Sequence, residues 1–87
     1  MQFEYDPAKS AANLDKHGID FVEAQGLWED PELVVLAARE QSEQRWLALG
    51  KARGSLWAAI FTVRAASIRL ISVRRARPEE ARAYEED

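Results

Sequence analysis

At the start of the chain, apolar and polar residues alternate and are followed by a polar turn, which predicts a strand and then a helix. Residues 3–5 are a short strand candidate that ends at Asp6 and Pro7. Asp6 can cap a helix and proline suits its first position, so we expect a helix over residues 7–16. Gly18 is placed to close this helix in a left-handed conformation.

A second helix is predicted immediately after this glycine. Asp20 and Glu23 have the spacing of a capping box, and Ile19 and Ala24 flank them at the positions of a hydrophobic staple. Glutamate, aspartate and proline at residues 29–31 end the apolar periodicity. We therefore expect two short helices joined by a tight turn.

Beyond the second helix the apolar period changes to that of strands. Short apolar runs separated by turns predict strands over residues 33–37, 45–49, 56–63 and 68–73. Residues 39–44 are expected to form a polar loop, Gly50 to end the second of these strands, and residues 51–54 and 64–67 to turn the chain.

Residues 78–86 predict a final helix. Pro78 suits a first helical turn, and Glu79 and Glu80 lie there, where the helix dipole favours acids. The whole pattern predicts an α+β fold with a mainly antiparallel sheet of four to five strands, two N-terminal helices and one C-terminal helix.

The strand predicted at residues 68–73 has an unusual pattern. Strict alternation divides its side chains between two faces: Ile68, Leu70 and Ser72 on one, Arg69, Ile71 and Val73 on the other. Neither face is uniformly apolar, which is typical of a strand covered at its middle on both sides. Three arginines with no acid among them come next: Arg74, Arg75 and Arg77. Because a guanidinium matches phosphate with paired donors, we expect a phosphate-binding edge here.

Composition places the chain among small globular domains. Its 87 residues predict one domain over residues 1–87, and 47% of them are hydrophobic. The absence of cysteine excludes disulfides, thiolate metal sites and thiol catalysis. No stretch approaches the length of a membrane span, and the opening residues lack the regions of a signal peptide. The expected location is the cytoplasm.

Charge is distributed unevenly along the chain. The formal net charge is −3, but residues 44–78 contain no acid and eight basic residues. This polarity predicts a basic sheet that binds a polyanion, flanked by acidic helices. The alternative is that helix acids neutralise sheet arginines within the monomer, where surface ion pairs leave no functional trace.

Two groups of residues carry a resemblance to a known family over essentially the full length. The first group is Phe3-Glu4-Tyr5-Asp6, Lys9, Asn13, Lys16-His17-Gly18, Phe21, Ala24, Trp28 and Asp30. The second is Arg45, Gly50, Arg64, residues 69–76, Glu80 and Tyr84. In these positions the chain resembles the BrnT family, the ribonuclease toxins of type II toxin-antitoxin systems, whose fold is similar to that of RelE toxins.

The resemblance implies a bacterial toxin that cleaves RNA and inhibits translation. It also implies neutralisation by a BrnA-type antitoxin encoded beside it, in an assembly of two toxins and two antitoxins. DNA binding would then belong to the antitoxin or the complex. No membrane partner and no cofactor is expected.

Metal-free RNA cleavage needs a base for the ribose 2′-hydroxyl, cations for the phosphate and an acid for the leaving 5′ oxygen. The candidates for proton transfer are His17, Lys16 and Glu43. Arg69 and Arg74 are the catalytic candidates for stabilising the phosphate, and RNA-phosphate contacts are expected from Arg45, Arg64, Arg75 and Arg77. The spacing of histidine, aspartate and glutamate residues predicts no metal site.

Several of these residues also have a structural interpretation. His17 could donate to the last carbonyls of its helix, and Lys16 could be a solvated helix end. Arg69 could be a buried partner for Glu80 or Asp30. The three tryptophans are expected in the core, because a small domain needs its large apolar side chains inside: Trp28, Trp46 and Trp57.

Two other function classes remain open from the sequence. In one, the basic sheet grips RNA or DNA without cutting it, through salt-sensitive phosphate contacts. In the other, the sheet docks an acidic partner such as the antitoxin, and the chain is an inactive toxin.

Overall fold

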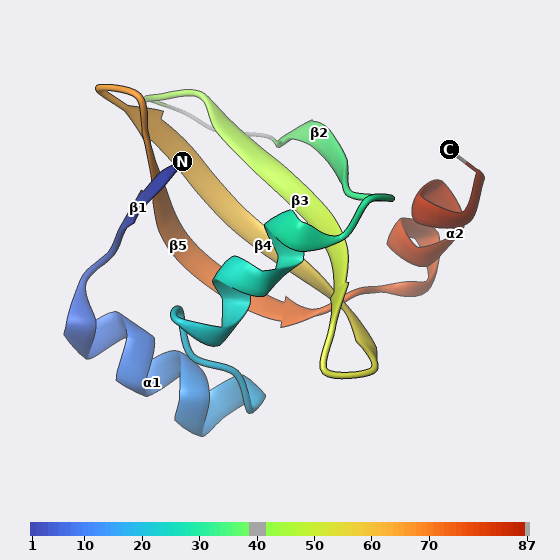
Figure 1. Cartoon of the computed structure of the whole chain (residues 1–87), viewed down its shortest axis with the longest axis horizontal. Helices are drawn as coiled ribbons and strands as arrows, with labels where there is room; N and C mark the ends of the chain where they lie inside the picture. Colours follow the sequence, from blue (N-terminus) through green and yellow to red (C-terminus); the bar gives the residue numbers. More distant parts are fainter. Residues whose placement is uncertain (39–41, 87) are drawn as a thin grey trace.

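The computed structural model describes residues 1–38 and 42–86, which form one sheet with helices packed against it (Figure 1). The elements in chain order are β1 (Gln2–Glu4), α1 (Pro7–His17), η1 (Glu23–Glu29), β2 (Val34–Ala38), β3 (Arg45–Ala52), β4 (Ser55–Arg64), β5 (Ser67–Arg75) and α2 (Pro78–Glu86). The described strands are ordered β1-β5-β4-β3-β2. All neighbours are antiparallel except β1, which is parallel to β5. The predicted α+β class and mainly antiparallel sheet are confirmed.

Helix α1 has the predicted ends. The Asp6 side chain accepts a hydrogen bond of 2.9 Å from the N–H of Ala8. Gly18 has a φ of 81°, and its N–H donates to the carbonyl of Leu14. Both ends of the helix therefore have partners for backbone groups that the helix itself leaves unpaired.

The second predicted helix differs from the expectation in type and start. Asp20 and Glu23 do form the reciprocal capping bonds, with each backbone N–H donating to the other carboxylate. The element that follows is the 3-10 helix η1 of seven residues, not an α-helix from residue 19, and its N-cap residue is Val22, which makes no side-chain capping bond. Gly26 in its middle lowers α-helical propensity, and short 3-10 segments are common as connectors. Each of the described helices is too short and too polar to cross a membrane.

The two faces of the sheet are covered to different extents. One face, here called the covered face, packs against η1 and the segment before it in the larger core, which contains Ile19, Phe21, Leu27, Ala59 and Leu70. The second core is smaller and joins α2 to the opposite face through Val34, Leu49, Ala58 and Tyr84. Among the described elements, α2 is the one that packs on this second face, here called the open face.

The tryptophans lie in or against the covered-face core, in agreement with the expectation that they are core residues. Trp57 is buried, and Trp28 and Trp46 are half-buried against the same core. Trp28 makes edge-to-face contacts with Phe3 and Phe61 at ring-centroid distances of 5.1 and 5.3 Å. These rings fill space between the strands and the first helices.

A β-bulge interrupts the strict alternation of side chains that was predicted for β5. Ile60 pairs with Ser72 and Phe61 pairs with Leu70, so Ile71 has no partner on β4. The extra residue shifts the alternation by one position, and Val73 joins Leu70 on the covered face. The strand therefore has one apolar face, and the expectation of cover on both sides of its middle is wrong.

Gly50 lies inside β3, not at its end as predicted. A Cβ atom at this position would meet the carbonyl oxygen and Cβ of Leu27 and the Cδ1 of Leu33 at 3.1 to 3.2 Å. Glycine is thus needed because η1 crosses the strand closely here, and β3 continues to Ala52. The hairpin turn falls on Arg53 and Gly54, both with positive φ.

The other hairpin turn, between β4 and β5, is made of two alanines. Ala65 and Ala66 have φ angles of 49° and 71°, the conformation that a two-residue turn of this hand requires. Alanine adopts this region at a cost that glycine avoids. This connection therefore contains local backbone strain.

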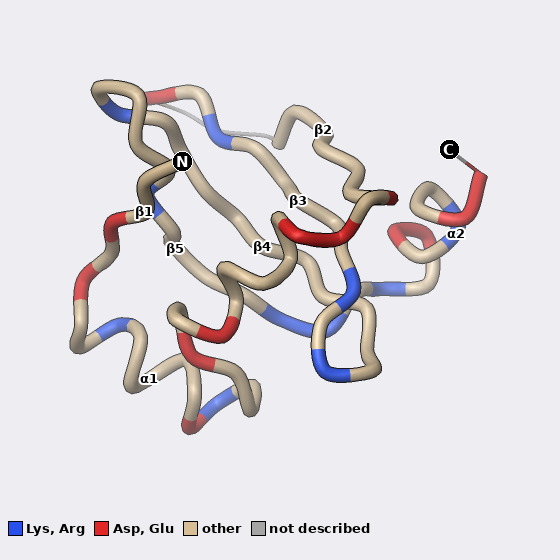
Figure 2. Tube along the Cα trace, in the orientation of Figure 1, with Lys and Arg blue, Asp and Glu red and all other residues tan. Residues whose placement is uncertain are grey.

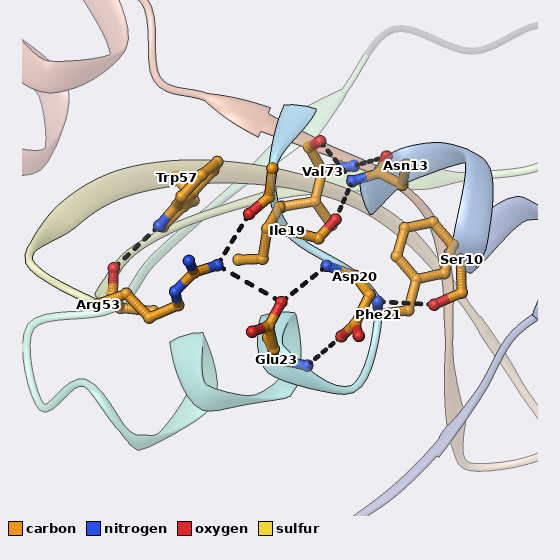
Figure 3. A network of polar contacts seen from close by, with 11 residues as sticks. Ser10, Asn13, Ile19, Asp20, Phe21, Glu23, Arg53, Trp57 and Val73 are labelled. Carbon is orange, nitrogen blue, oxygen red and sulfur yellow. Dashed lines mark hydrogen bonds and ion pairs between the residues drawn. The ribbon is translucent and has the colours of Figure 1, made fainter. Parts of the chain in front are cut away.

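Asn13 completes the edge of β5 beyond the end of β1 (Figure 3). Its side-chain amide donates to the carbonyls of Val73 and Ile19 at 2.9 and 2.8 Å, and its Oδ1 accepts from the N–H of Val73 at 3.1 Å. The amide thereby replaces a neighbouring strand. Nearby, Ser10 accepts a hydrogen bond from the N–H of Phe21 at 2.9 Å, which holds α1 to the covered-face core.

Candidate functional site

A row of polar side chains crosses the open face. Thr62 of β4 is the partner of Arg69 on β5, and Arg69 is the partner of Glu4 on β1. On the other side of Thr62, Arg45 begins β3 one residue before the Trp46–Phe61 pair, so it lies in the same row. Because neighbouring strands lie about 4.8 Å apart, the Cα atoms of Arg45 and Arg69 lie roughly 10 Å apart, with Thr62 on the strand between them.

Arg69 has a different partner from those predicted. Its guanidinium donates to Glu4 at 3.0 Å, not to Glu80 or Asp30. The strand pairing brings the two residues together from positions 65 apart in the chain. The pair is partly exposed, so it orients Arg69 while leaving the guanidinium accessible to a ligand.

Arg64 and Glu43 form a second ion pair, at 3.2 Å. Arg64 ends β4 two residues beyond Thr62 and so lies on the open face. Glu43 belongs to the segment just before β3, and the carbonyl of Gln44 in this segment accepts a hydrogen bond from Thr62. A candidate base from the sequence is thus held beside a candidate phosphate-binding arginine.

Arg74 pairs with an acid six residues further along the chain, on α2. Its two terminal nitrogens donate to the two carboxylate oxygens of Glu80 at 2.8 and 2.9 Å, and one also donates to the carbonyl of Arg75. These bonds lower the pKa of Glu80 against the opposing effect of burial. They also raise the pKa of Arg74. Although no acid lies among residues 74–77 in the sequence, Arg74 is paired with Glu80 and anchors α2 to the sheet.

The remaining arginines at this end point elsewhere. Arg75 lies over the ring of Trp57, with its guanidinium carbon 4.9 Å from the ring centroid, and so belongs to the covered side. Arg77 is exposed, and its backbone N–H donates to Glu80 at 2.8 Å. Arg74 and Arg75 therefore lie on opposite faces of the sheet.

The two candidates on α1 are separate from the open-face row. Lys16 is exposed and His17 half-buried at the helix end, next to the segment that enters the covered-face core. Within residues 1–38 and 42–86, no hydrogen bond or ion pair joins either residue to Glu43 or to a predicted arginine. The side chain of His17 donates to none of the described helix carbonyls either, so its predicted capping role is not seen.

A site that sequence reasoning missed lies at the other end of the open face. The hydroxyl of Tyr84 on α2 donates to Asp30 at 2.6 Å, and the N–H groups of Lys51 and Glu32 donate to the same carboxylate. The bond from Tyr84 lowers the pKa of Asp30 and raises the pKa of Tyr84 to about 12. No local signal in the sequence indicates this contact, although both residues belong to the family pattern.

The charge polarity predicted from the sequence is visible along the chain trace (Figure 2). Basic positions gather on strands and strand ends, and acidic positions on the helices and their connections. Four arginines of the basic segment nevertheless pair with glutamates: Arg53, Arg64, Arg69 and Arg74. Intramolecular neutralisation thus accounts for part of the basic charge. In the described part of the chain, no three histidine or acidic side chains are grouped as metal ligands.

The fold is a small α+β domain whose open sheet face carries two arginine–glutamate ion pairs, Arg69 with Glu4 and Arg64 with Glu43. A family model described as the ribonuclease toxin BrnT of type II toxin-antitoxin systems matches residues 5–80. The chain therefore belongs to the BrnT family of ribonuclease toxins, as the resemblance implied. A search of curated proteins finds no match.

Proposed function

We propose that this toxin cleaves RNA without a metal ion, at the open face of its sheet. The observation that carries the proposal is the row in which Arg45 and Arg69 flank Thr62. Side chains of this length, based about 10 Å apart, can converge on one phosphate between them. Charge that develops on the phosphate during cleavage would then be balanced by guanidinium groups held on rigid strands.

Glu43 is the base that we propose for the ribose 2′-hydroxyl. Arg64 holds its carboxylate at 3.2 Å, next to the strand that begins with Arg45. In this reaction Glu43 accepts the 2′-hydroxyl proton, and the 2′ oxygen attacks phosphorus to form a 2′,3′-cyclic phosphate. The bond to the 5′ oxygen breaks, and the leaving 5′ oxygen takes up a proton from solvent water. Glu4, which lies in the row and is paired with Arg69, is the alternative base.

We propose different roles for the other sequence candidates. Arg74 and Glu80 fix α2, which limits the open face at one end. Lys16, His17, Arg75 and Arg77 are proposed to contact more distant parts of the RNA or none of it. The cognate antitoxin is proposed to be of the BrnA type, in a cytoplasmic assembly of two toxins with two antitoxins, and DNA is bound through that assembly.

The test is incubation of purified protein with total RNA in EDTA. Arg45→Gln/Arg69→Gln is expected to lower the cleavage rate by about 100-fold or more, since cations at the reacting phosphate contribute that much. Lys9→Gln/Arg82→Gln is the matched control, because it removes two exposed positive charges from α1 and α2. It should retain cleavage.

Single variants identify the base. Glu43→Gln should lose most activity and Glu4→Gln should retain it; the reverse result would transfer the role to Glu4. Loss of cleavage in His17→Gln, together with normal cleavage by Arg45→Gln/Arg69→Gln, would reject the open-face site. If the parent cuts no RNA in EDTA and cuts after Mg²⁺ is added, metal independence is wrong.

A further inference from the structure

The two edges of the sheet differ in whether their outward backbone groups have hydrogen-bond partners. At one edge, β1 pairs with the first part of β5, and beyond it the Asn13 side chain bonds both backbone groups of Val73. At the other edge, β2 pairs with β3 on its inner side. No described strand pairs with the outer side of β2, which is the last strand in the sheet order; α2 lies further out on that side in Figure 1. The backbone N–H and C=O groups that point outward from β2 are therefore available to another strand.

The side chains of β2 suit such pairing. Its five residues are Val34, Val35, Leu36, Ala37 and Ala38, with no charge, proline or glycine among them. Val35 and Leu36 are 45% and 40% exposed, and they lie on opposite faces of the sheet. Edge strands usually carry charged residues or proline that prevent pairing with other chains, and β2 has neither. Within the described residues, β2 therefore presents an apolar edge that no other strand covers.

We infer that β2 is the docking edge for an extended segment of the cognate antitoxin, which adds a sixth strand to the sheet. The inference rests on the proposed function only in that a type II toxin has a protein antitoxin. Backbone hydrogen bonds along β2 would supply affinity, and aliphatic side chains of the added strand would cover Val35 and Leu36.

Area and charge favour the antitoxin over a second copy of this chain. Five strand residues span about 17 Å, and pairing over that length alone buries far less than the roughly 1,200 Å² of a stable interface. A longer partner can continue across the open face. Ala38 at the end of β2 is paired with Arg45, so acidic residues that come after the added strand would meet Arg45 and then Arg64. The segment is therefore expected to be aliphatic where it pairs and acidic beyond.

Binding of the purified cognate antitoxin is measured by calorimetric titration of the toxin and two variants. Val35→Lys/Leu36→Lys places two charges on the docking edge and should weaken binding by about 100-fold, as expected for two central apolar anchors. Val22→Lys/Val63→Lys adds the same charge at residues that are 60% and 53% exposed away from β2. This control should bind within about threefold of the parent.

Hydrogen exchange of the parent gives a second test that needs no variant. Alternate amides of residues 34–38 should exchange freely in the toxin and become protected in the complex. Unchanged exchange there, or equal binding by the edge variant and the parent, would overturn the inference. Protection that appears in the toxin alone and rises with its concentration would assign the edge to a second copy instead. Neither measurement depends on RNA cleavage, so a toxin that binds through β2 and cuts no RNA would reject the proposed function alone.

Discussion

Replacing Asn13 by alanine removes the side chain that completes the edge of β5. Three buried hydrogen bonds are lost, and the N–H of Val73, the carbonyl of Val73 and the carbonyl of Ile19 are left without these partners. Because β5 also carries Arg69 and Arg74, the change reaches the strand on which the proposed RNA-binding face depends.

The expected cost comes from those three groups. An unsatisfied buried polar group costs about 1–3 kcal/mol, and the lower end applies where water can enter the space of the missing side chain. Three groups then cost about 3–4 kcal/mol, from which roughly 0.5 kcal/mol is regained because alanine is the better helix former. A net loss of about 3 kcal/mol is a large part of the 5–15 kcal/mol typical of a domain and corresponds to a fall in Tm of about 15 °C.

Urea unfolding monitored by tryptophan fluorescence measures this loss. Asp15→Ala on the exposed side of α1 is the control and should change stability by less than about 0.5 kcal/mol. Asn13→Asp should also be destabilised, because a carboxylate accepts from the N–H of Val73 but cannot donate to the two carbonyls. Its deficit relative to the parent should shrink as pH falls, since a protonated carboxyl donates again. A cost below about 1 kcal/mol for Asn13→Ala would refute the claim that the amide replaces a strand.

Three further changes test other parts of the structure by the same unfolding assay. Ala65→Asn/Ala66→Gly should stabilise the protein by about 1–2 kcal/mol, because these residues adopt the positive φ of the turn at lower cost; no gain would contradict the strain. Gly50→Ala should destabilise the protein by about 1–3 kcal/mol, because the added Cβ clashes with η1. An unchanged unfolding midpoint would show that η1 moves to make room for the added atom. The lowered pKa of Asp30 adds stability that is lost as pH falls through it, and the raised pKa of Tyr84 adds stability that is lost as pH rises from about 10 to about 12. Tyr84→Phe should weaken the acidic dependence and abolish the alkaline one, and parallel profiles for variant and parent would argue against the bond.

Local signals were sufficient for most of the elements. The Asp6 cap, the Gly18 end and the Asp20–Glu23 pair act within a few residues, so the sequence predicts them directly. The apolar runs that became β2 to β5 are strong enough to define strands, and with the helices they predict the α+β class. The family pattern was likewise readable from the sequence, and the family match confirms it.

Contacts between distant parts of the chain decided the rest. The bulge at Ile71 depends on how β5 registers with β4, and the place of Gly50 depends on the passage of η1 over β3. Neither is encoded by alternation within one strand, because each strand accommodates a neighbour that the local sequence does not contain.

For the candidate site, too, one part could be predicted from the sequence and another part only from the tertiary structure. The sequence by itself determined which residue types could handle RNA: arginines in the basic segment, a few carboxylates and one histidine. Only the tertiary structure decided which of them meet, by pairing Arg69 with Glu4, Arg64 with Glu43 and Arg74 with Glu80. The physical reason is that ion pairs act over a few ångströms in space. Strand pairing brings Arg69 to Glu4 and Arg64 to Glu43, and the packing of α2 on the sheet brings Glu80 to Arg74.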